Sequence, residues 1–235
     1  MRQQPISIAF IISCLLTITS CSTAPRPEEP PPPPRVLILG DSISIAYTRV
    51  VRKFLGAKAV VIRPTNAKTK RAENCEGTTK GVGAIDRWLA LDGGNFDVIH
   101  FNFGLHDLKC VHPKTGSGSN NPSHPRQASL EVYTKQLHAI TERLLSTGAT
   151  LIFATTTPVP AGGVRPHREP EDVTRYNAAA KAIMDAHGIE VNDLYAFALP
   201  QLASIQRPKN VHFLPVGSKA LGMEVVKSIL RASHK

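Results

Sequence analysis

The sequence is poor in metal-binding patterns and in cysteine. It has 4 cysteines in 235 residues, and its 9 histidines are scattered without a paired partner. No cysteine or histidine spacing is typical of a zinc site, so we predict no metal cofactor. In an oxidising compartment Cys75 and Cys110 have two alternatives, a disulfide bond or two free, partly buried thiols.

No apolar run is long enough for a confident membrane span. The longest, from Ile6 to Ile18, follows the positively charged Arg2 and ends at small residues, as secretion signals do. Ile18-Thr19-Ser20-Cys21 then resembles a lipoprotein box. We therefore predict a signal peptide over residues 1–20 and lipidation of Cys21, with an uncleaved anchor helix as the alternative.

The predicted location follows from these N-terminal features. A proline-rich segment covers most of residues 21–34 and favours extended polyproline II, which makes it a semi-rigid linker. We expect an exported, membrane-anchored lipoprotein of the cell envelope, in the periplasm or at the outer membrane. The remaining residues, 35–235, are enough for one α/β domain.

Acidic residues are also scarce, with 18 Asp and Glu against 28 Lys and Arg, which gives a net charge of +10. Much of this charge lies between Arg49 and Lys80. It would attract an anionic polysaccharide or a lipid surface, but a solvated helix face and loop explain it more simply. No motif supports nucleic-acid binding, and we predict no nucleic-acid partner.

Strand-like and helix-like patterns alternate along residues 35–235. This alternation predicts a three-layer α/β/α fold with a five-stranded parallel sheet and a flavodoxin-like strand order. A polar loop at 110–127 is unusually long. The expected strands are 36–39, 59–63, 97–101, 150–154 and 189–191, and the expected helices are 43–55, 82–91, 130–145, 171–187, 195–205 and 217–230.

Chemically useful residues follow several of these strands. Gly40-Asp41-Ser42 ends the first strand at a helix start, and His212 precedes the last helix. Since the carboxyl ends of parallel strands share one edge, a hydroxyl, a base and backbone N–H donors would meet there, as acyl transfer requires. The competing role for Ser42 is a plain helix N-cap.

The chain resembles the SGNH (GDSL-type) hydrolase family at Gly40-Asp41-Ser42-Ile43 and at Val211-His212. The resemblance covers nearly all of residues 35–235. It implies that Ser42 is the nucleophile, that His212 is the base, and that the backbone N–H groups of Ser42 and Gly77 bind the oxyanion. Asn102-Phe103-Gly104-Leu105-His106-Asp107 is similar to the third block of one subset, in which His106 replaces the usual asparagine donor. The alternative for His106 is a hydrogen bond to a loop carbonyl.

One departure from the family concerns the acid. Lys209 stands where the family usually has an aspartate, three residues before the histidine, and Asn210 follows it. A backbone carbonyl would then hold His212 in a Ser–His dyad, which we favour. Otherwise Asp107 or Asp193 reaches in, or catalysis is impaired. Asp41, Asn102, Asp107 and Asn210 are the expected supporting residues, with Asp41 tying the rim loops together.

These expectations define a serine esterase that forms an acyl-serine intermediate and needs no cofactor. Family analogy suggests short acyl groups, above all acetyl, on a small ester or an acylated carbohydrate. A lysophospholipase or thioesterase is the alternative enzyme. A catalytically impaired binding lipoprotein of the envelope is the alternative from another class.

Overall fold

Five parallel strands form the central sheet, in the order β2-β1-β3-β4-β5. The structure, a computed structural model, describes residue 1 and residues 31–233. This strand order is the flavodoxin-like one, so the predicted fold is confirmed. The predicted signal peptide and Cys21 lie outside the described residues. The strands are β1 (Arg35–Leu39), β2 (Val60–Ile62), β3 (Val98–Phe101), β4 (Thr150–Ala154) and β5 (Glu190–Asn192).

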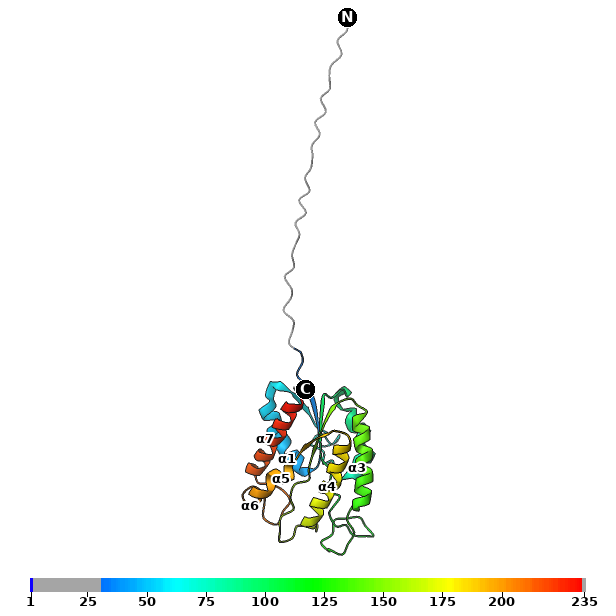
Figure 1. Ribbon diagram of the computed structural model, residues 1–235, viewed down its shortest axis with the longest axis vertical. Coiled ribbons are helices and arrows are strands. Elements are labelled where there is room, and N and C mark those ends of the chain that lie inside the picture. The colour runs from blue at the N-terminus through cyan, green and yellow to red at the C-terminus, as the bar shows by residue number, and fades with distance from the viewer. Residues whose placement is uncertain (2–30, 234–235) are drawn as a thin grey trace. The chain divides into compact units, whose positions relative to one another are not determined.

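Helices cover both faces of the sheet, as Figure 1 shows. One layer contains α1 (Ser42–Leu55), α5 (Leu194–Ala198) and α7 (Pro215–Ala232). The opposite layer contains α2 (Thr78–Leu89), α3 (Leu130–Leu145) and α4 (Pro170–Ala186). Right-handed crossovers between parallel strands produce this arrangement, because each helix must pack back onto the sheet.

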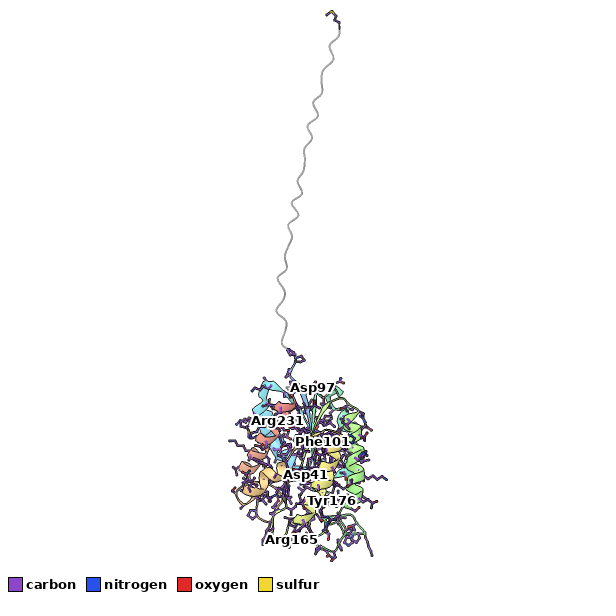
Figure 2. The ribbon with its side chains drawn as sticks, viewed as in Figure 1. Asp41, Asp97, Phe101, Arg165, Tyr176 and Arg231 are labelled. Atoms are coloured by element: carbon purple, nitrogen blue, oxygen red, sulfur yellow. The ribbon has the colours of Figure 1, made fainter. Side chains whose placement is uncertain are left out.

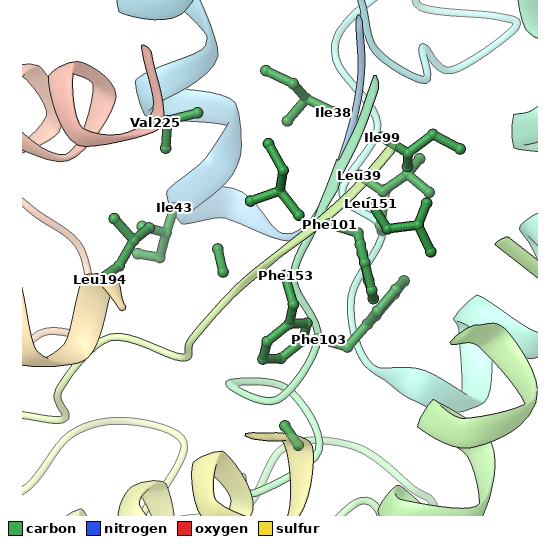
Figure 3. Close-up of a cluster of buried hydrophobic side chains, with 14 of the residues drawn as sticks. Ile38, Leu39, Ile43, Ile99, Phe101, Phe103, Leu151, Phe153, Leu194 and Val225 are labelled. Carbon is green, nitrogen blue, oxygen red and sulfur yellow. The ribbon is translucent and has the colours of Figure 1, made fainter. Parts of the chain in front are cut away.

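The core lies on both sides of the sheet. Val36 to Leu39 in β1 are fully buried, as expected for a central parallel strand covered on both faces. In Figure 3, Ile43, Leu194 and Val225 lie on one side of the strands, and Ile99 and Leu151 lie on the other. Burial of each such side chain contributes about 1.5–3 kcal/mol, so two apolar layers hold the strand ends in fixed positions.

The main differences from the predicted helices lie in three regions. Helix α2 begins at Thr78, four residues before the predicted start, because the carboxylate of Asp107 accepts the Thr78 N–H from a distant loop. The helix predicted over 195–205 is broken into α5, a 3-10 turn (Leu199–Gln201) and α6 (Leu202–Ile205). Pro200 lies at that break and has no N–H to donate. Helix α7 begins at Pro215, a favourable first helical residue.

The long polar loop at 110–127 is folded onto the domain. Isolated antiparallel bridges join Cys110 to Arg126 and Val111 to Gly118. Of the two alternatives for the cysteines, the structure has free thiols, since Cys75 and Cys110 are both buried and unpaired. Among the described residues, no helix is both long and apolar enough to cross a bilayer.

The amino and carboxyl ends of the parallel strands carry different parts of the chain. Arg35, the first residue of β1, donates its backbone N–H to Asp97 Oδ2 at 2.7 Å, just before β3 begins. Asp41 follows the other end of β1, and Figure 2 shows Asp97 and Asp41 well separated along the sheet. The loops that follow the strands therefore gather at the carboxyl ends of the strands, which form the edge of the sheet that carries Asp41.

Candidate active site

Ser42 and His212 meet at this edge although they lie 170 residues apart. The Ser42 Oγ is 2.9 Å from His212 Nε2. Ser42 is the first residue of α1, and the Asp41 side chain, not Ser42, caps this helix by accepting the Ile43 N–H at 2.9 Å. The competing role of Ser42 as the N-cap is therefore wrong, and its hydroxyl is left for the imidazole.

Asn210 holds the second ring nitrogen of His212, Nδ1. Asn210 Oδ1 lies 2.8 Å from His212 Nδ1 and accepts the His212 backbone N–H at 2.9 Å. Because a backbone N–H can only donate, the atom it meets is the amide oxygen, which fixes the orientation of the amide. Nδ1 must then carry the ring proton, and Nε2 is free to accept the Ser42 hydroxyl. The expected backbone carbonyl is replaced by a side-chain amide.

Neither alternative acid contacts His212. Asp107 accepts the Thr78 N–H at 2.8 Å and the Thr78 hydroxyl at 2.6 Å, so it anchors the start of α2. Asp193 caps α5 through the Ala196 N–H and pairs with Lys181. The suggestion that one of these carboxylates reaches the imidazole is wrong, because each is held by an N-terminal helix turn elsewhere.

Gly77 lies beside this anchored helix start. A Cβ built on Gly77 would come within 2.7 Å of the Asp107 carboxylate, so only glycine fits there. Burial raises the pKa of Asp107 to about 6. Within residues 31–233, the backbone N–H groups of Gly77 and Ser42 donate no hydrogen bond. Both donors precede or begin helices, where backbone N–H groups favour negative charge.

His106 is partly buried and uncharged at neutral pH. Burial, the largest influence, lowers its pKa to about 4, so the ring is uncharged at neutral pH. Its Nδ1 lies 3.4 Å from Lys109 Nζ, and an ammonium group only donates. This contact favours the tautomer with the proton on Nε2, in which Nε2 can donate. Within residues 31–233, the His106 ring forms no hydrogen bond to a loop carbonyl, which was the predicted alternative.

Two buried arginines that the sequence analysis overlooked hold the loops of this edge. Arg63 donates to the backbone oxygens of Gly40 at 2.6 Å and Glu73 at 3.1 Å, and to Ser44 Oγ at 2.7 Å. Arg63 thereby joins the loops after β1 and β2, a role expected of Asp41. Arg168 donates to the Leu105 oxygen at 2.8 Å and fixes the loop that carries His106.

Other polar residues at this edge are structural. Asn102 donates its amide to the Ala154 oxygen at 2.7 Å and so links the ends of β3 and β4. Behind it lies a cavity of about 10 Å³, lined by Asp41, Asn102 and Thr155 among others. This volume is about that of one water-sized probe, so it is too small for an acyl chain.

A much larger groove opens beside His212. Its volume is about 590 Å³, within the range of small-molecule sites. It runs between the first half of α1, which contributes Ile43 and Arg49, and the segment before α7, which contributes Arg207, His212 and Phe213.

The pKa of His212 is lowered from its ordinary value of 6.5. Burial is the largest cause, the Asp41 carboxylate opposes it, and Arg207 and Arg168 add to it. A base must be neutral to accept a proton, so a lowered pKa keeps His212 competent in mildly acidic solution.

We therefore expect kcat/KM for p-nitrophenyl acetate to persist as the pH falls through 6.5 and to decline only below that value. Arg207→Gln removes one influence that lowers the pKa, so its acid limb should move to higher pH. Profiles from about pH 4 to about pH 9 test both points. An acid limb above 6.5 in the wild type, or no displacement in the variant, would contradict this expectation.

The prediction that the histidines lack paired partners is wrong in two places. The His112 and His124 rings lie edge to face at 5.3 Å between centroids, within the long loop. His138 and His187 lie 5.7 Å apart, on α3 and at the end of α4. Neither pair contacts Ser42 or His212, and both arise from chain crossings that spacing does not reveal.

Comparison with known proteins agrees with this geometry. The model of the GDSL-like lipase/acylhydrolase family matches residues 38–220. Among proteins with curated functions, none matches this chain. A lipase/acylhydrolase from Enterococcus faecalis has a similar structure, with a TM-score of 0.65 and 20% identity over 83% of this chain and 95% of that one.

Two further similar structures carry names that state a substrate. One is an acetyl xylan esterase, with a TM-score of 0.61 and 14% identity over 83% of this chain and 99% of that one. The other is a catalytic mutant of an acetylxylan esterase from Geobacillus stearothermophilus, with a TM-score of 0.59 and 14% identity over 85% and 93%. At these identities the likeness establishes the fold.

Proposed function

We propose that this protein removes short acyl groups from carbohydrate. The premise is that the chain belongs to the GDSL-like lipase/acylhydrolase family and hydrolyses ester bonds. Acetyl is the expected acyl group. The observation that carries the proposal is the continuous row of hydrogen bonds from Asn210 through His212 to Ser42.

In this mechanism Ser42 Oγ attacks the ester carbonyl while His212 Nε2 takes its proton. The Asn210 oxygen holds the Nδ1 proton in place and stabilises the imidazolium that forms. His212 then gives the proton to the leaving alcohol, and water hydrolyses the acyl-serine by the same steps in reverse order. No metal or organic cofactor enters this scheme.

The oxyanion of each tetrahedral intermediate is stabilised by three donors. These are the backbone N–H groups of Ser42 and Gly77 and the Nε2–H of His106. The unused N–H groups and the neutral His106 tautomer support this assignment. Such donors typically contribute about 10²–10³ in rate each, because they are oriented before charge develops.

Two features favour a short acyl group on a sugar. The long loop at 110–127 is polar, whereas a lipase-like enzyme would present a broad apolar lid. The similar structures include proteins named as acetyl xylan esterases. A lysophospholipase or thioesterase, the alternative enzyme, requires room for a long chain.

An acyl-length series tests the proposal. We expect kcat/KM for p-nitrophenyl esters to be highest for acetyl and to fall by about tenfold or more by octanoyl, because each misplaced methylene costs binding. Release of acetate from acetylated xylo-oligosaccharides should accompany it. A preference for octanoyl would favour the lipase-like alternative. Background rates with every ester would favour a binding lipoprotein without catalysis.

Replacing His106 tests its role as a donor. We expect His106→Ala to lower kcat for p-nitrophenyl acetate by about 10²-fold, whereas His106→Asn, the usual family residue, should recover part of the loss. The melting temperature of both variants reports the alternative role, since a residue that only holds its loop would lower stability instead. His112→Ala, in the long loop, is the matched control.

The proposed location is the cell envelope, with the protein anchored through lipid on Cys21. The signal-like segment and the proline-rich linker in the sequence support it. Membrane fractionation of cells that express the full chain tests it. The wild type should sediment with membranes and incorporate a labelled fatty acid, and Cys21→Ala should incorporate none. Equal labelling of both proteins would contradict the proposed anchor.

A further inference from the structure

The groove beside His212 is placed to receive the alcohol half of the ester. His212 contributes to its wall, and in the proposed mechanism this imidazole protonates the leaving alcohol. The oxyanion donors Gly77 and His106 are not among the residues that line it. The groove therefore affects which alcohol the enzyme accepts as the other half of the ester.

The charge of this groove is one-sided. Its lining includes two arginines, Arg49 and Arg207, and no carboxylate. Neither arginine forms an ion pair with any residue in 31–233. Other exposed arginines do, including Arg87 with Glu73, Arg143 with Asp86 and Arg231 with Glu190. Two unpaired guanidinium groups along one groove are suited to bind an anion, since guanidinium matches carboxylate geometry.

Each of the two arginines has a defined place relative to the catalytic pair. Arg49 lies seven residues after Ser42 on α1, which is about 10 Å along the helix axis. Arg207 is tied directly to the imidazole segment, because its backbone N–H donates to the His212 oxygen at 3.0 Å. Apolar Ile43, Val50 and Phe213 line the groove as well, and they can support the faces of sugar rings.

We propose that this groove binds an acidic saccharide, so that the preferred substrate is an acylated sugar or oligosaccharide that carries a carboxylate near the ester. The inference rests on the proposed function and narrows it to one class of alcohol. Arg207 meets a charge close to the ester, and Arg49 meets one further along the chain. A neutral xylan-type alcohol would leave both guanidinium groups without a partner.

The test uses two substrates that differ only in charge. One is a monoacetylated methyl glucuronoside with a free carboxylate, and the other is its methyl ester at the carboxyl group. For the wild type we expect kcat/KM to favour the acid by about tenfold or more at low salt and less at high salt. The preference should shrink towards one in Arg207→Gln, and an acidic disaccharide should reveal the same loss in Arg49→Gln.

Lys135→Gln is the matched control, because it removes one exposed positive charge from α3 on the opposite layer. It should keep the preference. A wild-type ratio near one, or an equal loss in Lys135→Gln, would overturn the acidic-saccharide inference and leave the esterase intact. Better hydrolysis of an acyl glycerophosphate than of the acid sugar would also overturn it. Absence of turnover even with p-nitrophenyl acetate would remove the proposed function itself.

A separate group of side chains lies at the junction of α3 and α4. Glu142 Oε1 is 3.2 Å from His187 Nε2 and 4.0 Å from His138 Nε2. The three ligand atoms all lie within 4.8 Å of one another. His138 and Glu142 are one helical turn apart on α3, and His187 ends α4 just before β5. The group thus lies towards the starts of the strands, away from Ser42.

These three side chains suit a divalent metal ion that prefers nitrogen ligands. Two imidazoles and one carboxylate recur as the protein ligands of zinc, with water in the fourth position. Ligand atoms of a tetrahedral zinc site lie about 3.3 Å apart. The Glu142–His187 pair already has this separation. His138 and Glu142 are exposed, so a side-chain rotation without backbone movement can bring the third ligand in.

We infer that His138, Glu142 and His187 form a surface site for Zn²⁺ that links α3 to the end of α4. It touches no residue of the candidate active site, so we expect bound metal to change the stability of the fold and not ester hydrolysis. Bound metal should stabilise the fold in proportion to its concentration above the dissociation constant.

Calorimetric titration of the full, chelator-treated protein with zinc chloride tests the site. We expect one equivalent to bind, a rise in melting temperature with zinc but not with magnesium, and a loss of affinity of at least about tenfold in His187→Ala and Glu142→Gln. His124→Ala, which disrupts a histidine pair in the long loop, should bind as the wild type does. No saturable binding, or binding unchanged in His187→Ala, would overturn the site.

Discussion

Replacing Ser42 with alanine is expected to lower kcat for p-nitrophenyl acetate by about 10⁴-fold or more. The residual rate would come from water that attacks the ester with help from the histidine and the oxyanion pocket. The hydroxyl at 2.9 Å from His212 Nε2 is the nucleophile of the proposed mechanism. His212→Ala should cause a loss of similar size. Because the two residues act as one unit, the double variant should be no worse than either single variant.

Steady-state kinetics of the three variants measure this effect. Ser42→Ala should fold normally, because Asp41 rather than Ser42 caps α1, and its melting temperature should stay within about 2 °C of the wild type. Ser204→Ala, an exposed serine in α6, is the matched control and should keep full activity. A Ser42→Ala variant that retained most of its turnover would refute the acyl-serine mechanism.

Replacing Asn210 with alanine should lower kcat by about 10²–10⁴-fold, the range expected when the orienting group of a catalytic histidine is lost. The Asn210 oxygen accepts both the Nδ1 proton and the backbone N–H of His212, so it fixes the tautomer and the ring position together. Asn210→Asp should retain far more activity, because a carboxylate accepts the same two hydrogen bonds. It should also raise the pKa of His212, since a negative charge favours the imidazolium.

The pH dependence of kcat/KM separates orientation from folding. In Asn210→Asp the acid limb should move to higher pH than in the wild type, because the new carboxylate lies against Nδ1 of the catalytic imidazole. Lys209→Gln, at the adjacent position, is the control and should behave as the wild type does. If Asn210→Ala retained wild-type turnover, Ser42 and His212 would form a dyad that needs no orienting side chain.

Much of the fold could be predicted because its signals are local. The apolar run from Val36 to Leu39 ends at Gly40 and passes directly into a helix, and the same alternation recurs along the chain. Ser42 and His212 were predictable as well, because each follows a recognisable motif. Their meeting depends only on the shared edge of a parallel sheet.

The role of Asn210 could not be predicted without the conformation of the turn that carries it. Lys209 occupies the usual position of the acid, but its backbone φ of 51° is left-handed, and the next side chain folds back onto His212. Asparagine commonly accepts an N–H two residues further along, and Asn210 does so here. This preference was the available signal, and it points to the side chain rather than to a backbone carbonyl.

Arg63 and Arg168 could not be identified from the sequence. Basic residues are usually exposed, and nothing in the local pattern separates Arg63 from its exposed neighbours. Its burial depends on carbonyl groups of Gly40 and Glu73 that the fold brings together. The His138–His187 contact has the same origin, since only the packing of α3 against α4 unites the two rings.

The hydrogen bond from Arg35 to Asp97 lies at the end of the domain opposite the candidate active site. The chain enters β1 at the edge where the strands start, and Ser42 lies at the opposite edge. A tether joined at Arg35 would therefore attach to the domain away from Ser42 and leave the groove beside His212 open. An open approach of this kind suits large substrates, such as polymers and oligomers.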